Sequence, residues 1–160
     1  MEKPTTRMSE DHKIFMAMAI EEAKAGAASG EQPFGAVVVL DGKVVCRSHS
    51  LKVSTSDATA HAETLAVKHA TQKLGRRTIP EAVFYSTCEP CPMCLGAVLN
   101  AGIGTIVLGA RHAQVTAAGY HEYSVESFAR MTGWNLRIIE GVMTDECIAL
   151  YTNPAVQLTR

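Results

Sequence analysis

The sequence lacks any apolar run of the roughly 20 residues that a membrane-spanning helix needs. Its first residues, MEKPTTRMSEDHK, are polar and lack the apolar centre of a signal peptide. It also lacks the even cysteine count of a complete disulfide framework, because it has five cysteines. We therefore expect a cytoplasmic protein with no membrane partner, in which clustered cysteines are more often metal-binding or catalytic.

A surplus of positive charge is also missing. Lys and Arg number 15 against 16 Asp and Glu, so the formal net charge is −1. A protein whose main task is to bind a phosphate backbone usually shows a basic surplus or stripe. The only tight basic cluster is GRR at 75–77. This balance favours a small uncharged substrate and makes tRNA a less favoured partner, although it leaves RNA open.

There is no internal repeat and no low-complexity segment. The 160 residues, 47% of them hydrophobic, predict one domain over 1–160, with residues 1–8 as a loose tail. Ser9 is the expected cap of a first helix that fades at AGAASG. Strands follow at 34–40 and 43–48, and Asp41-Gly42 between them predicts an antiparallel hairpin. The remaining expected elements are a helix at 60–74, a strand at 82–87, a helix opening at CPMC, a strand at 104–109, a helix at 124–131, a strand at 135–141 and a helix at 144–151 that Thr144 caps.

This alternation predicts an α/β protein with a five-stranded mixed sheet and helices on both faces, which is a three-layer α/β/α sandwich. The last three strands should run parallel through right-handed crossovers. In such sheets, functional residues gather at the carboxyl ends of strands and at the helix starts that follow.

Two motifs lie at such helix starts, TAHAE at 59–63 and PCPMC at 90–94. Cys91 and Cys94 share one helix face, where exposed amide groups and the helix dipole stabilise thiolates. With His61 they make three zinc ligands and leave the fourth position to water, which is the arrangement of a catalytic zinc site. Zn²⁺ would lower the pKa of that bound water and provide hydroxide near neutral pH.

Glu63 is then the expected general acid–base, because it lies two residues from a ligand. The combination H-x-E with P-C-x-x-C is typical of zinc deaminases. Each motif alone is weak, since Cys-x-x-Cys is also found in redox pairs and structural sites. An iron–sulfur site that includes Cys88 would need more suitably spaced cysteines. We interpret Cys88 as the last residue of the third strand, and Cys46 and Cys147 as packing residues.

At these motifs the chain resembles the cytidine deaminase-like superfamily, in its guanine deaminase and tRNA adenosine deaminase branch. PFGAVVV, DATAHAE and TCEPCPMCLGA are similar to guanine deaminases, whereas IGTIVLGARHAQVTAAG and EGVMTDECIAL are more similar to tRNA adenosine deaminases. The resemblance implies a homodimer and one zinc ion on His61, Cys91 and Cys94, with Glu63 as the proton shuttle. It also implies that the Ala62 backbone and Phe34 contact the substrate ring.

The chain departs from this family where the base is bound. Ser50, preceded by His49, stands where the family has an Asn, and serine cannot make the two-pronged contact of an amide. In AGYHEYS, Glu122 could accept hydrogen bonds from a ring N–H and an adjacent amino group, although an exposed helix-start acid fits this position equally well. The tail retains only one aromatic residue, Tyr151, where guanine deaminases are aromatic-rich.

The expected function is zinc-dependent hydrolytic deamination of an amino-substituted nucleobase. Guanine leads, and isocytosine and amino-triazines share its pattern of N–H and amino groups. One alternative is deamination of adenosine to inosine in tRNA. An alternative of another class is a non-catalytic zinc-binding or RNA-binding module, which would not need an acid–base residue such as Glu63.

Overall fold

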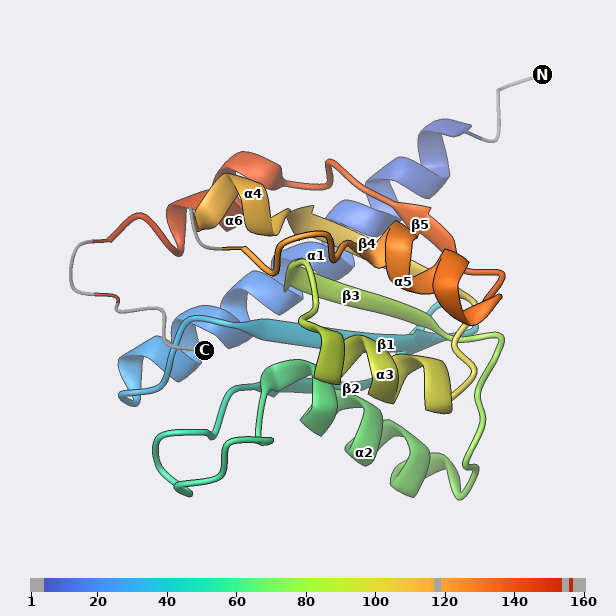
Figure 1. Ribbon diagram of the computed structural model, residues 1–160, viewed down its shortest axis with the longest axis horizontal. Coiled ribbons are helices and arrows are strands. Elements are labelled where there is room, and N and C mark those ends of the chain that lie inside the picture. The colour runs from blue at the N-terminus through green and yellow to red at the C-terminus, as the bar shows by residue number, and fades with distance from the viewer. Residues whose placement is uncertain (1–4, 117–118, 154–155, 157–160) are drawn as a thin grey trace.

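The computed structural model describes residues 5–116, 119–153 and 156, and side chains from residue 10 onward (Figure 1). No helix among these residues is long and apolar enough to span a bilayer. The elements, in chain order, are α1 (Thr5–Ala28), β1 (Gly35–Leu40), β2 (Lys43–His49), α2 (Ala62–Leu74), β3 (Val83–Cys88), α3 (Pro92–Asn100), β4 (Thr105–Ala110), α4 (His112–Val115), α5 (Val125–Thr132), β5 (Arg137–Ile139) and α6 (Thr144–Ala149).

The five strands form one mixed sheet in the order β2-β1-β3-β4-β5. β1 pairs antiparallel with both β2 and β3, while β3, β4 and β5 run parallel. The hairpin between β1 and β2 turns at Asp41 and Gly42, whose φ angles of 51° and 73° suit a two-residue turn of the primed type. The predicted hairpin and the parallel order of the last three strands are therefore confirmed.

Helices cover both faces of the sheet, which confirms the predicted three-layer architecture. One apolar core lies between the sheet and α2, α3 and α5, and the second lies between the sheet and α1 and α6 (Figure 1). Apolar residues on both faces of a strand are typical of strands buried on both sides. β1 is accordingly buried at five of its six residues.

Close approach of α1 to β1 helps to position the site. At Gly35, a Cβ atom would lie 1.9 Å from the carbonyl oxygen of Ala19, so any larger residue would push the helix away from the strand. The same glycine donates its N–H to Thr87 Oγ1 on β3 at 3.1 Å. Phe34, which directly precedes Gly35, is thereby held close to the carboxyl end of β3.

Three local predictions differ from the structure. α1 begins at Thr5 rather than after Ser9, since no glycine or proline follows Pro4 to prevent an earlier start; residues 1–4 of the predicted tail lie outside the described residues. Met143, with φ of 54°, is the N-cap of α6, because the Thr144 hydroxyl donates to Gly109 O instead of capping the helix. The short helix α4 was not predicted from the sequence.

Candidate active site

The helices that carry the two motifs, α2 and α3, lie on the same face of the sheet and begin next to each other (Figure 1). His61 is the N-cap of α2, and Cys91 is the N-cap of α3, with Pro92 at the first helical position. Pro fits there because this position has no intrahelical acceptor for an N–H. Both caps have extended backbone, so their side chains project from the helix ends, and Cys94 follows in the first turn of α3.

The side chains of His61, Cys91 and Cys94 converge on one point. The two sulfur atoms lie 3.4 Å apart, and His61 Nδ1 lies 3.5 Å from Cys94 Sγ and 3.8 Å from Cys91 Sγ. Tetrahedral zinc, with bonds of about 2.0–2.3 Å, would separate its ligand atoms by roughly 3.5–3.8 Å. Both the spacing and the donor set of one imidazole and two thiols therefore fit a zinc ion.

The electrostatics of this cluster favour a thiolate at Cys91. Its pKa falls to about 4, first because of its hydrogen bond with the Cys94 side chain. The same hydrogen bond is the main reason why the pKa of Cys94 is raised. The pKa of His61 is raised chiefly by its hydrogen bond with Cys91. One thiolate is thus already stabilised by its protein neighbours, as metal binding requires.

Glu63 lies beside the cluster with 5% of its surface exposed. Its Oε2 atom lies 3.7 Å from Cys94 Sγ, and Ser86 Oγ donates to its Oε1 atom at 3.4 Å. Burial raises the pKa of this carboxyl group to about 7. A carboxyl group that exchanges its proton near neutral pH is suited to general acid–base chemistry.

A cavity opens above His61 and Glu63. Phe34, Ser50 and Ala62, which the sequence comparison with the family suggested as substrate contacts, all line it. Phe34 is supported from behind by Tyr151, with ring centroids 5.1 Å apart, and the Tyr151 hydroxyl lies 2.8 Å from Thr87 Oγ1. The single aromatic residue of the tail is therefore packed beneath the cavity wall.

Two predicted substrate contacts are not among the cavity-lining residues. Glu122 is exposed, as the alternative interpretation of this residue supposed. His49 Nδ1 instead lies 2.8 Å from Glu22 Oε2 on α1. His49 therefore contacts α1, whereas Ser50, directly after β2, lines the cavity.

A further part of the cavity wall was not predicted from the sequence, apart from His112, which was weighed as a weak candidate more typical of a surface loop. This wall comprises His112, Val115, Thr116, Gly119 and Tyr120, and we call it the α4 wall. The ring of His112 packs against that of Tyr120 at an angle of 56°, with centroids 4.9 Å apart, and burial lowers the pKa of its imidazole. The segment shows neither helical nor strand periodicity, so its aromatic and His content was the only signal.

The other cysteines serve packing as predicted. Cys88 is the buried last residue of β3 and also borders the cavity, and Cys147 is buried on α6. The Cys46 thiol donates to Ala66 O at 3.1 Å. All five cysteines are free.

Comparison with known proteins identifies the family. Residues 10–144 match the sequence model of the MafB19-like deaminases. The chain belongs to the MafB19-like deaminase family. As a member it is a hydrolytic deaminase, and the superfamily resemblance seen in the sequence is confirmed.

Relatives of this deaminase include proteins with two different substrates. It is 34% identical over 142 residues to the tRNA-specific adenosine deaminase of Bacillus subtilis, covering 88% of this chain and 85% of that protein. It is 35% identical over 113 residues to the guanine deaminase of the same organism, covering 70% and 72%. It is 41% identical over 107 residues to the chloroplastic tRNA(adenine(34)) deaminase of Arabidopsis thaliana, with 67% of this chain covered but only 8% of that longer protein.

Solved structures show the same division. A structure from a study of A-to-I editing by tRNA:A34 deaminases superposes with a TM-score of 0.75 at 34% identity, covering 85% of this chain and 97% of that chain. A guanine deaminase from Nitrosomonas europaea superposes with a TM-score of 0.77 at 26% identity, covering 87% and 81%. Family membership therefore establishes a deaminase and leaves two substrate classes.

Proposed function

We propose that this deaminase hydrolyses the exocyclic amino group of a free nucleobase in a zinc-dependent reaction, with guanine or a related amino-substituted ring as substrate. The observation that carries the proposal is the position of a buried carboxylic acid against three zinc-type donors at the base of a cavity. Glu63 approaches Cys94 Sγ to 3.7 Å, and His61, Cys91 and Cys94 offer donor atoms within 4.8 Å of one another.

Each residue of the site has a separate task in this proposal. His61, Cys91 and Cys94 would hold zinc, which when bound supplies Lewis-acid chemistry that lowers the pKa of water toward neutrality. Glu63 accepts a proton from the attacking water and delivers it to a ring nitrogen. It then carries the second proton to the departing amino group, so that one base and one water give a ring carbonyl and ammonia.

The cavity walls favour a flat ring. Phe34, Tyr120 and His112 all line the cavity and provide aromatic surfaces suited to stacking. Ala62 also lines the cavity, and we propose that its backbone hydrogen-bonds a ring edge. Ser50 contributes one hydroxyl group, whose oxygen accepts the Lys52 N–H at 3.3 Å. A formal net charge of −1 suits an uncharged base better than a polyanion.

Adenosine in tRNA is the second candidate substrate, and several relatives support it. The related proteins from Bacillus subtilis, Agrobacterium fabrum and Haemophilus influenzae are all tRNA-specific adenosine deaminases. Deamination within tRNA requires the nucleotide to be flipped into the cavity while its phosphates are bound outside. The affinity of the protein for tRNA should therefore fall steeply with added salt, whereas its affinity for a neutral base should not.

An ammonia-release assay on the purified zinc-loaded protein tests the proposal. The panel should contain guanine, isocytosine, cytosine, adenine, their nucleosides and amino-triazines, alongside inosine formation in a tRNA anticodon stem-loop. We expect release from guanine or a related free base, with a KM that salt hardly changes. Inosine formation without release from any free base would replace the leading substrate by tRNA, and no turnover of any compound would refute the proposed function.

A further inference from the structure

Glu89 is a second buried glutamate beside the cavity, with 5% of its surface exposed. It lies between the end of β3 and the zinc-type donor Cys91, and its own N–H donates to Ala110 O at the end of β4 at 2.8 Å. Glu89 also borders the cavity, but Glu63 is the carboxylate that lies against the donor cluster. The acid–base chemistry proposed above does not use Glu89.

The carboxylate of Glu89 holds the backbone at the first residue of the α4 wall and at the start of α5. Its Oε1 atom accepts the backbone N–H of His112 at 3.1 Å, where the wall begins. Its Oε2 atom accepts the backbone N–H of Val125 at 3.1 Å, where the chain leaves the wall and enters α5. One side chain thus fixes two backbone positions on either side of Tyr120.

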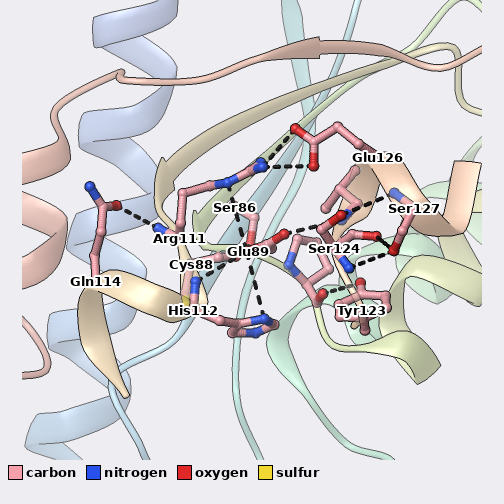
Figure 2. A network of polar contacts seen from close by, with 12 residues as sticks. Ser86, Cys88, Glu89, Arg111, His112, Gln114, Tyr123, Ser124, Glu126 and Ser127 are labelled. Atoms are coloured by element: carbon pink, nitrogen blue, oxygen red, sulfur yellow. Dashed lines mark hydrogen bonds and ion pairs between the residues drawn. The ribbon is translucent and has the colours of Figure 1, made fainter. Parts of the chain in front are cut away.

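Arg111 supports this arrangement from outside (Figure 2). Its Nε atom lies 3.7 Å from Glu89 Oε1, and its Nη2 atom donates to both carboxylate oxygens of Glu126 on α5 at 2.6 and 2.7 Å. The Tyr123 hydroxyl donates to Pro90 O, which adds a contact between the same segment and the Cys91 loop. A buried carboxylate with two amide donors and a guanidinium neighbour has its charge satisfied, so its conformation is well defined.

We propose that Glu89 is a positioning residue that fixes the α4 wall at a set distance from the Cys91 loop and so sets the width of the substrate cavity. The geometry separates two tasks. The donor cluster and Glu63 carry the chemistry, whereas Glu89 holds the aromatic wall against which the ring would stack. Loss of the Glu89 contacts should therefore weaken substrate binding more than turnover. The substrate part of this inference rests on the proposed function.

Glu31 offers a matched control, because it is also buried and holds a different loop. Its carboxylate accepts the N–H groups of Val53 and Ser54 at 2.9 and 2.8 Å. Glu89→Gln and Glu31→Gln each replace one acceptor oxygen by an NH₂ group, which cannot accept a hydrogen bond. Each variant should loosen only the loop that its own carboxylate holds.

Amide hydrogen exchange measured by NMR tests the positioning role without any substrate. In Glu89→Gln we expect His112 or Val125 to exchange at least tenfold faster than in wild type, with the zinc content and the exchange of Val53 and Ser54 unchanged. Glu31→Gln should give the reverse pattern. Unchanged exchange at both His112 and Val125 in folded Glu89→Gln protein would overturn the proposal, whatever the substrate proves to be.

Steady-state kinetics then test the consequence for binding, with guanine or with the anticodon stem-loop if that is what turns over. Glu89→Gln should raise KM at least tenfold and change kcat less than threefold. A fall in kcat at unchanged KM would contradict the division of tasks. Should Glu89→Gln not fold, Tyr123→Phe removes a single oxygen from the same segment, and it should raise KM at least threefold at normal zinc content. An unchanged KM in that variant would equally refute the proposal.

Discussion

Glu63 and Glu89 show how two carboxylates of similar burial can serve different purposes. The Glu63 carboxyl group contacts Ser86 Oγ, Cys94 Sγ and its own backbone N–H, and its pKa still rises to about 7 because burial disfavours its charged form. Glu89 accepts two backbone N–H groups, so its charge is compensated within the fold. A group that exchanges protons needs the first environment, and a group that holds a backbone needs the second.

Replacement of the Glu63 carboxyl tests its chemical role. Glu63→Ala should bind one zinc ion, because the remaining donors His61, Cys91 and Cys94 are intact. Its kcat should fall by about 10²–10⁴-fold, the usual contribution of a general acid–base. Zinc content by mass spectrometry and kcat by ammonia release measure the two effects. Glu81→Ala, at an exposed glutamate, is the control, and a Glu63→Ala enzyme as active as this control would exclude the role.

Ser50 is the residue at which specificity can be altered. It is 3% exposed and lines the cavity, and it stands where the guanine deaminase and tRNA adenosine deaminase branch has an asparagine. Ser50→Asn provides both a donor and an acceptor to a ring edge, and asparagine can accept the Lys52 N–H as serine does. One net hydrogen bond is worth about 0.5–1.5 kcal/mol, so KM for guanine should fall up to roughly tenfold. A raised KM for guanine would mean that the amide obstructs the base.

At the scale of elements, the features that were predicted best from the sequence are those that depend on local patterns of residues. The hairpin at Asp41-Gly42, the helix that Gly75 ends and the donor positions at two helix starts all depend on residues close together in the chain. By contrast, the short helix α4 begins at His112, whose N–H is bonded to the distant Glu89. A four-residue element held by a remote carboxylate carries no periodicity, so only the folded chain reveals it.

Close packing between β4 and α6 gives a prediction at this scale. A Cβ atom at Gly109 would lie 2.2 Å from Cys147 Sγ and 2.9 Å from Thr87 O. Gly109→Ala should therefore destabilise the fold by about 1–3 kcal/mol, as overpacked cores do. Gly96→Ala is the control, because nothing lies within 4 Å of its Cβ position and α3 gains about 0.5–1 kcal/mol. Urea unfolding measures both, and equal midpoints for the two variants would contradict this packing argument.

At the scale of the whole molecule, the donor cluster joins segments that are distant in the chain. His61 precedes α2, which packs on β1 and β2, while Cys91 and Cys94 belong to the loop and helix that follow β3. An ion bound by all three would add a cross-link between these two parts of the α2–α3 layer. Such an ion stabilises the folded state because the unfolded chain does not offer the same preformed site.

Removal of the metal should therefore lower the stability of the entire domain. At zinc about 1,000-fold above its Kd the linkage is worth about 4 kcal/mol, so a chelator should lower Tm by roughly 10 °C. Cys91→Ala should lose the zinc and have a lower Tm that chelator does not change further. Cys46→Ala is the matched control, since Cys46 lies on β2 and its thiol donates to Ala66 O, away from the cluster. Cys46→Ala should keep its zinc and its response to chelator. A Cys91→Ala protein with the same Tm as the zinc-loaded wild type would show that the ion makes no contribution to folding.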